Sequence, residues 1–292
     1  MLFNSFEFLA FLAVVYGLYL VLPHRWQNWM LLAASYVFYG WWNWRFLSLI
    51  LFTTVLDYVV SLKVASSTND RSKKLFLSIS LICNLGLLGV FKYFNFFVES
   101  FIDLSVRLGF HLRWEPLHII LPVGISFFTF QSISYSIDVY RGHIAPPRKF
   151  LDFALFVAFF PQLVAGPIQR ATHFLPQVVS PRRIELDQVA RGGFLILYGL
   201  FKKTVIADGL ADAVNSVYNS SVTGTPGIDV LVATYLFVLQ IYCDFSGYTD
   251  IARGVAKLMG FDLSKNFMTP FYAQSPSEYW TRWHISLSSW VK

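Results

Sequence analysis

His284 is the residue of this sequence best suited to acid–base chemistry, because it lies between Trp283 and Ile285 in an otherwise apolar chain. The unperturbed pKa of histidine lies near neutrality, so its imidazole can accept and return a proton at physiological pH. Transfer of an acyl group to a hydroxyl needs such a base, together with donors that stabilise the developing oxyanion. A packed histidine at a membrane interface explains the same residue without chemistry. His284 is therefore a candidate catalytic base, and the groups around it decide between a catalytic and a structural role.

Arg282 precedes this histidine by two residues, which places the two side chains on different faces if the segment is helical. We expect Arg282 to meet lipid headgroups or an anionic substrate rather than to act together with His284. The remaining histidines lie in loops or at the ends of apolar runs and are assigned no role: His24, His111, His118, His143 and His173.

Two acidic residues, Asp244 and Asp250, lie close to apolar sequence. An acid at membrane depth is costly and is a functional candidate by default. For Asp244 this interpretation and a water-exposed helix end are equally good, whereas for Asp250 we favour pairing with a base such as Arg253. A metal site made of the two acids and His284 lacks a recognisable ligand spacing, so no metal is predicted.

The composition indicates a protein that is solvated by lipid. The 292 residues are 55% hydrophobic and 18% aromatic but only 14% charged, whereas soluble domains are about 25% charged. The net charge of +6 comes from basic residues between apolar runs, which favours cytoplasmic loops near anionic headgroups and argues against binding of nucleic acid. Cys83 and Cys243 lie far apart in apolar runs and make no disulfide or metal framework.

Eight segments approach the length of about 20 apolar residues that a transmembrane helix needs. The predicted spans are Phe6–Leu22, Trp29–Trp44, Phe46–Val64, Leu75–Val98, Leu117–Ile137, Phe150–Ala165, Gly193–Ile206 and Ile228–Tyr242. The sixth and seventh are short or interrupted, which suggests re-entrant or interfacial helices. Arg71, Lys73 and Lys74 follow the third span and place that loop in the cytoplasm, together with His24 and Arg25. The sequence thus predicts an all-α, polytopic transmembrane protein with residues 1–292 in a single membrane domain.

In the middle of the chain, prolines and glycines that interrupt apolar stretches occur together with polar residues. Broken backbone at membrane depth is tolerated only where protein or water satisfies the freed groups. Ordinary helix packing explains any one of these residues, but together they favour a cavity or funnel. The residues concerned are Pro122, Gly124, Gln131, Ser134, Asp138, Pro161, Gln162, Gly166, Pro167 and Gln169.

Four sequence blocks are specific in combination: Leu121–Gln131 with Ile137–Arg141, Phe159–Ile168, Tyr242–Asp250 and Tyr279–Ser288. Together they resemble the membrane-bound O-acyltransferase family, and in particular its bacterial branch that O-acetylates alginate. The resemblance implies a ring of helices around a central funnel. It also implies transfer of an acyl group from a cytoplasmic-side donor, acetyl-CoA or an acyl carrier, to hydroxyls of a secreted polysaccharide. The expected location is the bacterial inner membrane, with membrane lipids and polysaccharide-modifying proteins as partners and no bound cofactor.

The same resemblance assigns site residues. His284 matches the first of two family histidines, in a Trp-His-Ile-Ser-Leu motif, and is the expected catalytic residue. The residues expected to bind substrate or to shape the funnel are Gln131, Gln162, Pro167, Asp244, Ser246, Gly247 and Arg282. The resemblance places the family's principal catalytic histidine downstream, in a later Trp-His-Gly-like motif, and this sequence ends at Lys292 before such a motif. We therefore expect a fragment or a short divergent member that is deficient in catalysis by itself.

Two other classes of function stay open at this point. A transporter or channel is one, since broken helices and intramembrane polar residues also build translocation paths. A non-catalytic scaffold that docks partner enzymes is the other. The aromatic surroundings of His284 and the lack of an evident inverted repeat favour acyl transfer.

Overall fold

The computed structural model describes residues 1–110, 119–220 and 225–291, and within these residues every regular element is a helix. The elements are α1 (Phe6–Val21), α2 (His24–Asn43), η1 (Trp44–Phe46), α3 (Leu47–Ser66), α4 (Asp70–Arg107), α5 (Ile125–Tyr140), α6 (Phe150–Ala158), α7 (Phe160–Leu163), α8 (Ala171–Val179), α9 (Leu186–Leu200), η2 (Phe201–Ala207), α10 (Asp208–Tyr218), α11 (Gly227–Leu258), η3 (Pro270–Tyr272), α12 (Pro276–Arg282) and α13 (Ile285–Val291). The predicted all-α class is confirmed.

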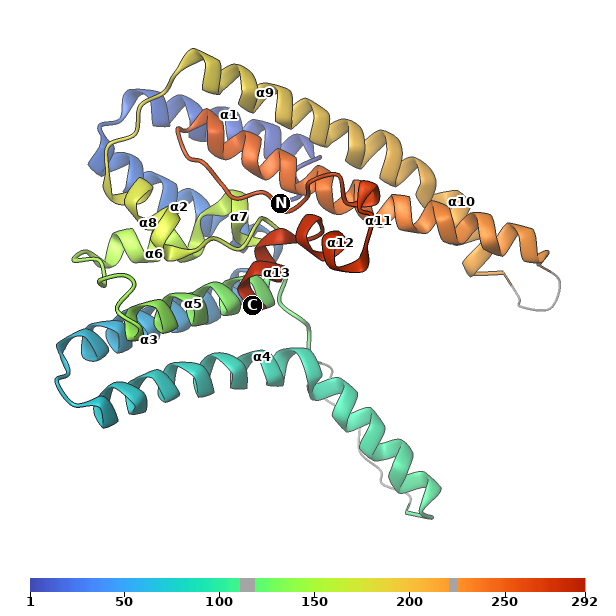
Figure 1. Ribbon diagram of the computed structural model, residues 1–292, viewed down its shortest axis with the longest axis horizontal. Helices are drawn as coiled ribbons and strands as arrows, with labels where there is room; N and C mark the ends of the chain where they lie inside the picture. The colour runs from blue at the N-terminus through green and yellow to red at the C-terminus, as the bar shows by residue number, and fades with distance from the viewer. Residues whose placement is uncertain (111–118, 221–224, 292) are drawn as a thin grey trace.

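The helices form two groups with short helices between them. Figure 1 shows α3, α4 and α5 side by side below, and α9 and α11 side by side above. The short helices α6, α7 and α8 lie between the groups: α6 packs against α2 and α3, α7 packs against α2, and α8 packs against α6 and α5. The far end of α4 and the pair formed by α10 with the start of α11 extend away from this centre.

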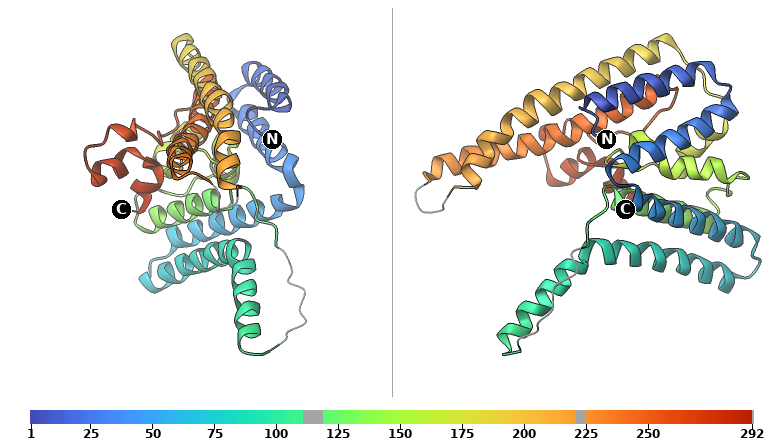
Figure 2. Two further views of the ribbon diagram at one scale, coloured as in Figure 1. Left: turned by 90° about the vertical axis from the view of Figure 1, so that its right-hand side faces the viewer. Right: turned by 180° about the vertical axis from the view of Figure 1, so that it is seen from behind.

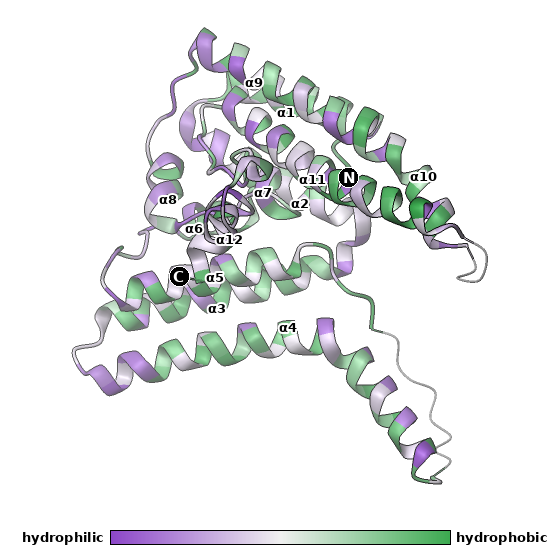
Figure 3. Cartoon of the chain, turned by 45° about the vertical axis from the view of Figure 1, so that its right-hand side comes forward, coloured by the Kyte–Doolittle hydropathy of each residue, from purple (hydrophilic) through white to green (hydrophobic). Residues whose placement is uncertain are grey.

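Three apolar helical stretches are long enough to cross a membrane: His24–Ser66, Asp70–Arg107 and Gly227–Leu258. Large apolar side chains on the surface fit lipid as solvent, since Ile82 is 71% exposed and Phe194 is 66% exposed. Hydrophilic residues gather at the start of α4, at the start of α9 and over α8 (Figure 3). The α1–α2 and α3–α4 turns lie at the same end of the molecule (Figure 1), as the basic residues of both turns predict.

Several predicted boundaries differ from the structure. The span predicted over Leu117–Ile137 begins later, because Gly124 has φ +76 and only Ile125–Tyr140 is helical; residues 117–118 lie outside the described residues. Residues 171–179 lie in no predicted span but form α8, whose apolar face is buried. The span predicted over Ile228–Tyr242 continues to Leu258, because ion pairs compensate the acids of its second half.

Glycines let α9 and α11 approach each other backbone to backbone. A Cβ atom at Gly199 would lie 2.6 Å from the Gly247 carbonyl oxygen. About two turns away, a Cβ atom at Gly254 would lie 2.6 Å from the Gly192 carbonyl oxygen. Figure 2 shows the two helices running along each other. The two contacts therefore form one seam of small residues, a common way for helices to pack in membranes.

Replacing Gly247 by Ala is expected to destabilise the protein by about 1–3 kcal/mol, the usual cost of overpacking. The added Cβ atom would lie 2.8 Å from the Gly199 carbonyl oxygen, so the helices must separate. Gly193→Ala is the matched control on α9, because nothing lies within 4 Å of its Cβ position. Thermal unfolding of the natural full-length protein in detergent would compare the two, and equal midpoints would contradict the seam.

Candidate active site

His284 lies between the short helices α12 and α13 in an unusual backbone conformation. Its φ is +42°, in the left-handed region that residues other than glycine rarely adopt. Such a conformation costs about 1–3 kcal/mol and persists only where surrounding contacts fix it. The contacts around His284 therefore matter for its position.

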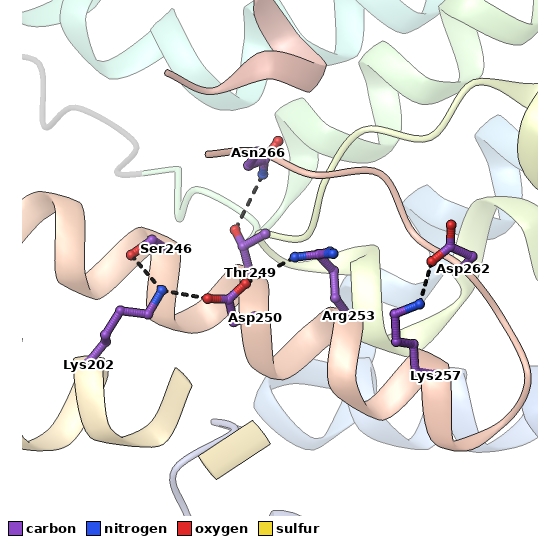
Figure 4. A network of polar contacts seen from close by, with 8 residues as sticks. All are labelled: Lys202, Ser246, Thr249, Asp250, Arg253, Lys257, Asp262 and Asn266. Carbon is purple, nitrogen blue, oxygen red and sulfur yellow. Dashed lines mark hydrogen bonds and ion pairs between the residues drawn. The ribbon is translucent and has the colours of Figure 1, made fainter. Parts of the chain in front are cut away.

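Asn266 supplies those contacts. Its backbone carbonyl accepts a hydrogen bond from the Ile285 N–H at 2.9 Å, and its Oδ1 accepts from Ser286 Oγ at 2.6 Å. The Asn266 side chain is fully buried, and its Nδ2 donates to Thr249 Oγ1 of α11 at 3.4 Å (Figure 4). Ser286 Oγ also accepts from the Ile168 N–H at 3.1 Å. The residues that follow His284 are thus tied to α11 and to the loop before α8.

Aromatic rings hold the imidazole. The ring of Phe245 from α11 meets it edge to face, with centroids 4.8 Å apart, and the ring of Phe127 from α5 lies at 6.4 Å. The Nε2 atom of His284 is buried and has no hydrogen-bond partner among the described residues. Burial lowers the pKa of His284 below its usual value of 6.5. The imidazole is therefore neutral at neutral pH, and a neutral ring nitrogen can accept a proton.

The segment Asp244–Gly247, predicted to lie near the central cavity, is part of α11. Phe245 is the residue of this segment that reaches His284. Ser246 and Gly247 face η2, a π-helical turn that continues α9. π-helical turns are frequent at functional sites. The polar residues of the segment therefore belong to the contact between α11 and η2.

Two lysines of η2 pair with the acids of α11. Lys202 is 5% exposed, and its Nζ lies 2.5 Å from Asp250 Oδ2 and 3.1 Å from Ser246 Oγ (Figure 4). Lys203 Nζ lies 2.5 Å from Oδ1 of Asp244, whose side chain is 52% exposed. These pairs compensate charge that would otherwise be costly in an apolar helix.

Asp250 also pairs with Arg253, as we favoured from the sequence. Nη1 of Arg253 lies 3.2 Å from Oδ1 of Asp250, so one carboxylate serves two cations. Within residues 1–110, 119–220 and 225–291, no three His, Cys, Asp or Glu side chains gather as metal ligands would.

The break between α6 and α7 is stabilised by two residues predicted to shape the funnel. The Phe160 N–H donates to Ser35 Oγ at 3.0 Å instead of continuing the hydrogen bonds of α6. The Phe156 carbonyl oxygen, left without that donor, accepts from Gln131 Nε2 at 2.6 Å and from Gln162 Nε2 at 2.7 Å. Protein groups thus satisfy the broken backbone, as buried breaks require.

Pro167 and Arg282 are the last two predicted site residues. Pro167 is buried directly before Ile168, whose N–H donates to Ser286 Oγ. Arg282 Nη2 lies 2.5 Å from Glu278 Oε1 within α12. Pro167 therefore belongs to the loop that supports His284, whereas Arg282 is held by its own helix.

Sequence reasoning missed Phe127, Phe245, Asn266 and Lys202. A signal existed for Lys202, because a lysine pair within a predicted span is unusual and marks a partner or a pathway. Asn266 gave no comparable signal, since its partners lie 17 to 20 residues away in the sequence.

Comparison with known proteins gives the family. Residues 146–292 match the model of the membrane-bound O-acyltransferase family. The chain is 42% identical over 297 residues to the "Probable alginate O-acetylase" of Azotobacter vinelandii, with 100% of this chain and 58% of that protein covered. It is 36% identical over 325 residues to the peptidoglycan O-acetyltransferase of Helicobacter pylori, covering 100% of this chain and 60% of that protein. It is 29% identical over 180 residues to the teichoic acid D-alanyltransferase of Bacillus subtilis, covering 61% of this chain and 45% of that protein.

The chain therefore spans about 58–60% of the length of the two relatives that it matches throughout. The part that matches the family model includes α6 to α13, and with them His284, Phe245 and Asn266. Its apolar helices show a multi-pass membrane protein. On the family match, the relatives and the helical membrane architecture together, this chain belongs to the membrane-bound O-acyltransferase family.

Proposed function

We propose that this chain carries part of the catalytic centre of an O-acyltransferase of the bacterial inner membrane. The enzyme would move an acetyl group from a cytoplasmic-side thioester to hydroxyls of a secreted polysaccharide such as alginate. The observation that carries the proposal is the buried, unpartnered Nε2 atom of His284, whose imidazole is neutral at neutral pH. The names of relatives that O-acetylate alginate and peptidoglycan support it.

His284 would act as the general base. Its Nε2 takes the proton of the acceptor hydroxyl while that oxygen attacks the thioester carbonyl carbon. The electron pair on the carbonyl oxygen re-forms the C=O double bond when the C–S bond breaks, and the bonding pair of the C–S bond leaves with the sulfur as a thiolate. The proton on His284 then passes to the departing thiolate, which leaves as a thiol. Phe127 and Phe245 would shield the imidazole from water during these steps.

The donor and the partners follow from the same chemistry. Acetyl-CoA and an acylated carrier protein both present a thioester from the cytoplasm. Lipids surround the apolar helices, and proteins that modify the polysaccharide would complete the delivery of the acyl group.

The test is acetyl transfer by the natural full-length protein in proteoliposomes. Labelled acetyl-CoA, or in a second arm an acetylated carrier protein, is added on the side of the basic loops, and alginate is present on the other side. We expect label on the polysaccharide that mild alkali releases, as it does from an ester. Label that crosses the membrane without ester formation would instead support a transporter. If neither ester nor transport is detected with either donor, the scaffold interpretation gains.

A further inference from the structure

A pocket of about 920 Å³ opens between the start of α2, the loop that leads into α6 and the end of α8. Three basic side chains line it, Arg25, Arg148 and Lys149, and all three are exposed. Within the described residues, none of the three forms an ion pair with a carboxylate. Asp152, the acid of the pocket lining, accepts a hydrogen bond from Asn28 Nδ2 at 3.3 Å. The positive charge of the three basic residues is therefore available to a ligand.

The first turns of two helices also border this pocket. His24 and Arg25 of α2 line it, as do Phe150 and Leu151 of α6. Neither helix has a side-chain cap that accepts a hydrogen bond from its first N–H groups. The first N–H groups of a helix have no partner within it and carry a partial positive charge, so they attract anions. Two helix N-termini and three cations thus make this pocket a place for an anion.

The loop that carries two of the cations is held in position. The Tyr58 hydroxyl of α3 donates to the Arg148 carbonyl oxygen at 3.2 Å. The ring of Tyr58 also meets the ring of Phe150 edge to face, with centroids 5.3 Å apart. Residues 146–147, both prolines, precede Arg148 and restrict its backbone. A restrained loop loses less conformational entropy when a ligand binds to it.

The position of the pocket favours a lipid over a soluble anion. The membrane-spanning stretch His24–Ser66 begins in it. Figure 1 shows the starts of α2 and α6 and the helix α8 at the end of the molecule that carries the α1–α2 and α3–α4 turns, the end that basic residues place in the cytoplasm. Trp29 and Phe150, both exposed, add apolar surface to the lining. The pocket thus combines cations for a phosphate with apolar side chains for the part of a lipid next to its phosphate.

We propose that this pocket binds the headgroup of an anionic phospholipid of the cytoplasmic leaflet, such as phosphatidylglycerol. Arg25, Arg148 and Lys149 would contact the phosphate through charge-assisted hydrogen bonds. Nε2 of His24 lies 3.1 Å from the Val179 carbonyl oxygen, so it carries the proton, and the buried Nδ1 has no hydrogen-bond partner among the described residues. A hydroxyl of the headgroup glycerol would donate to that Nδ1. Such a site would bind lipid whether or not the protein transfers acyl groups.

Native mass spectrometry of the natural full-length protein in detergent tests this assignment. The protein is titrated with phosphatidylglycerol or with phosphatidylcholine of the same acyl chains, and the dissociation constant of each lipid is measured. We expect tighter binding of phosphatidylglycerol, and at least about tenfold weaker binding of it by the double variant Arg25→Gln with Arg148→Gln, since each basic residue near an anionic headgroup contributes a factor of about five. Binding of phosphatidylcholine should not change. Arg148→Lys keeps the charge and should keep the preference for phosphatidylglycerol.

The matched control is the double variant Arg71→Gln with Lys74→Gln, which removes the same charge from the α3–α4 turn at the same end of the molecule but outside the pocket lining. It should bind phosphatidylglycerol as the unmodified protein does. Equal midpoints of thermal unfolding without added lipid would show that both double variants are folded.

Three results would overturn the assignment. Equal weakening by the two double variants would mean a general attraction to the basic surface. Equal affinity of the unmodified protein for the two lipids would mean that the pocket does not recognise the anionic headgroup. Binding of inorganic phosphate that depends on Arg25 and Arg148, without binding of phosphatidylglycerol, would mean a site for a soluble anion.

Discussion

Replacing His284 by Asn is expected to lower the turnover number for acetyl transfer by about 10²–10⁴-fold and to leave the protein folded. The substitution removes the imidazole that would take the proton of the acceptor hydroxyl. Asparagine is among the residues that best tolerate positive φ, so the backbone at φ +42° need not change. The hydrogen bonds from Ile285 and Ser286 to Asn266 do not involve the side chain at 284 and should remain. Initial rates in proteoliposomes would give the turnover number.

Two control variants separate the base from the backbone. His143→Asn makes the same change at a histidine whose side chain is 57% exposed, and it should keep normal turnover. His284→Ala removes the ring but also places a less tolerant residue at positive φ, so it should lose both activity and thermal stability. If His284→Asn folds normally and turns over at the normal rate, His284 is not the base.

If His284 is the general base, its pKa determines how kcat/KM depends on pH. Burial lowers the pKa of His284 from 6.5, so the base form persists below pH 6.5 and is lost only as the pH falls through the lowered pKa. We expect kcat/KM to decrease on the acid side with a midpoint below 6.5. A midpoint above 6.5 would mean that another group controls the rate.

Replacing Asp250 by Asn is expected to destabilise the protein by about 3–5 kcal/mol, because it leaves buried cations without their carboxylate. Lys202 is 5% exposed and the Arg253 side chain 12% exposed, and both pair with Asp250. The loss would loosen the contact between η2 and α11 from which Phe245 reaches the histidine. The midpoint of thermal unfolding of the natural protein in detergent would measure the effect.

Asp187→Asn is the matched control for this change. It removes one carboxylate from an ion pair with Arg191 in which both side chains are more than 70% exposed, and such pairs contribute only about 0–1 kcal/mol. The double variant Asp250→Leu with Lys202→Met removes a cation together with the acid and should recover part of the stability. Equal midpoints for Asp250→Asn and Asp187→Asn would show that the Lys202–Asp250 pair is not buried as described.

The sequence predicted those features of the structure that depend on neighbouring residues in the chain. Long apolar runs predicted the membrane helices. The aromatic residues beside His284 in the sequence made it a candidate site residue before its spatial neighbours were known. Helix ends were harder, because α11 continues through Asp244 and Asp250 only when Lys203 and Lys202 compensate them. A rule that stops a span at the first acid therefore ends this helix too early.

Pairings across the chain could not be predicted from residue types. The seam of Gly199 and Gly247 joins two helices whose register no local pattern specifies. Asn266 looks like an ordinary loop residue until its hydrogen bonds to Ile285 and Ser286 are known. The helix α8 was missed because polar residues and Pro176 dominate its sequence, although Phe174 is fully buried.

The most direct test of the central claim compares ester formation on alginate by the natural full-length protein and by its His284→Asn variant, at equal amounts of folded protein in the same proteoliposomes. We expect alkali-labile acetyl groups from the unmodified protein and a yield at least about 100-fold lower in initial rate from the variant. Equal ester formation by the two proteins would contradict the role of His284 as the base of an O-acyltransferase.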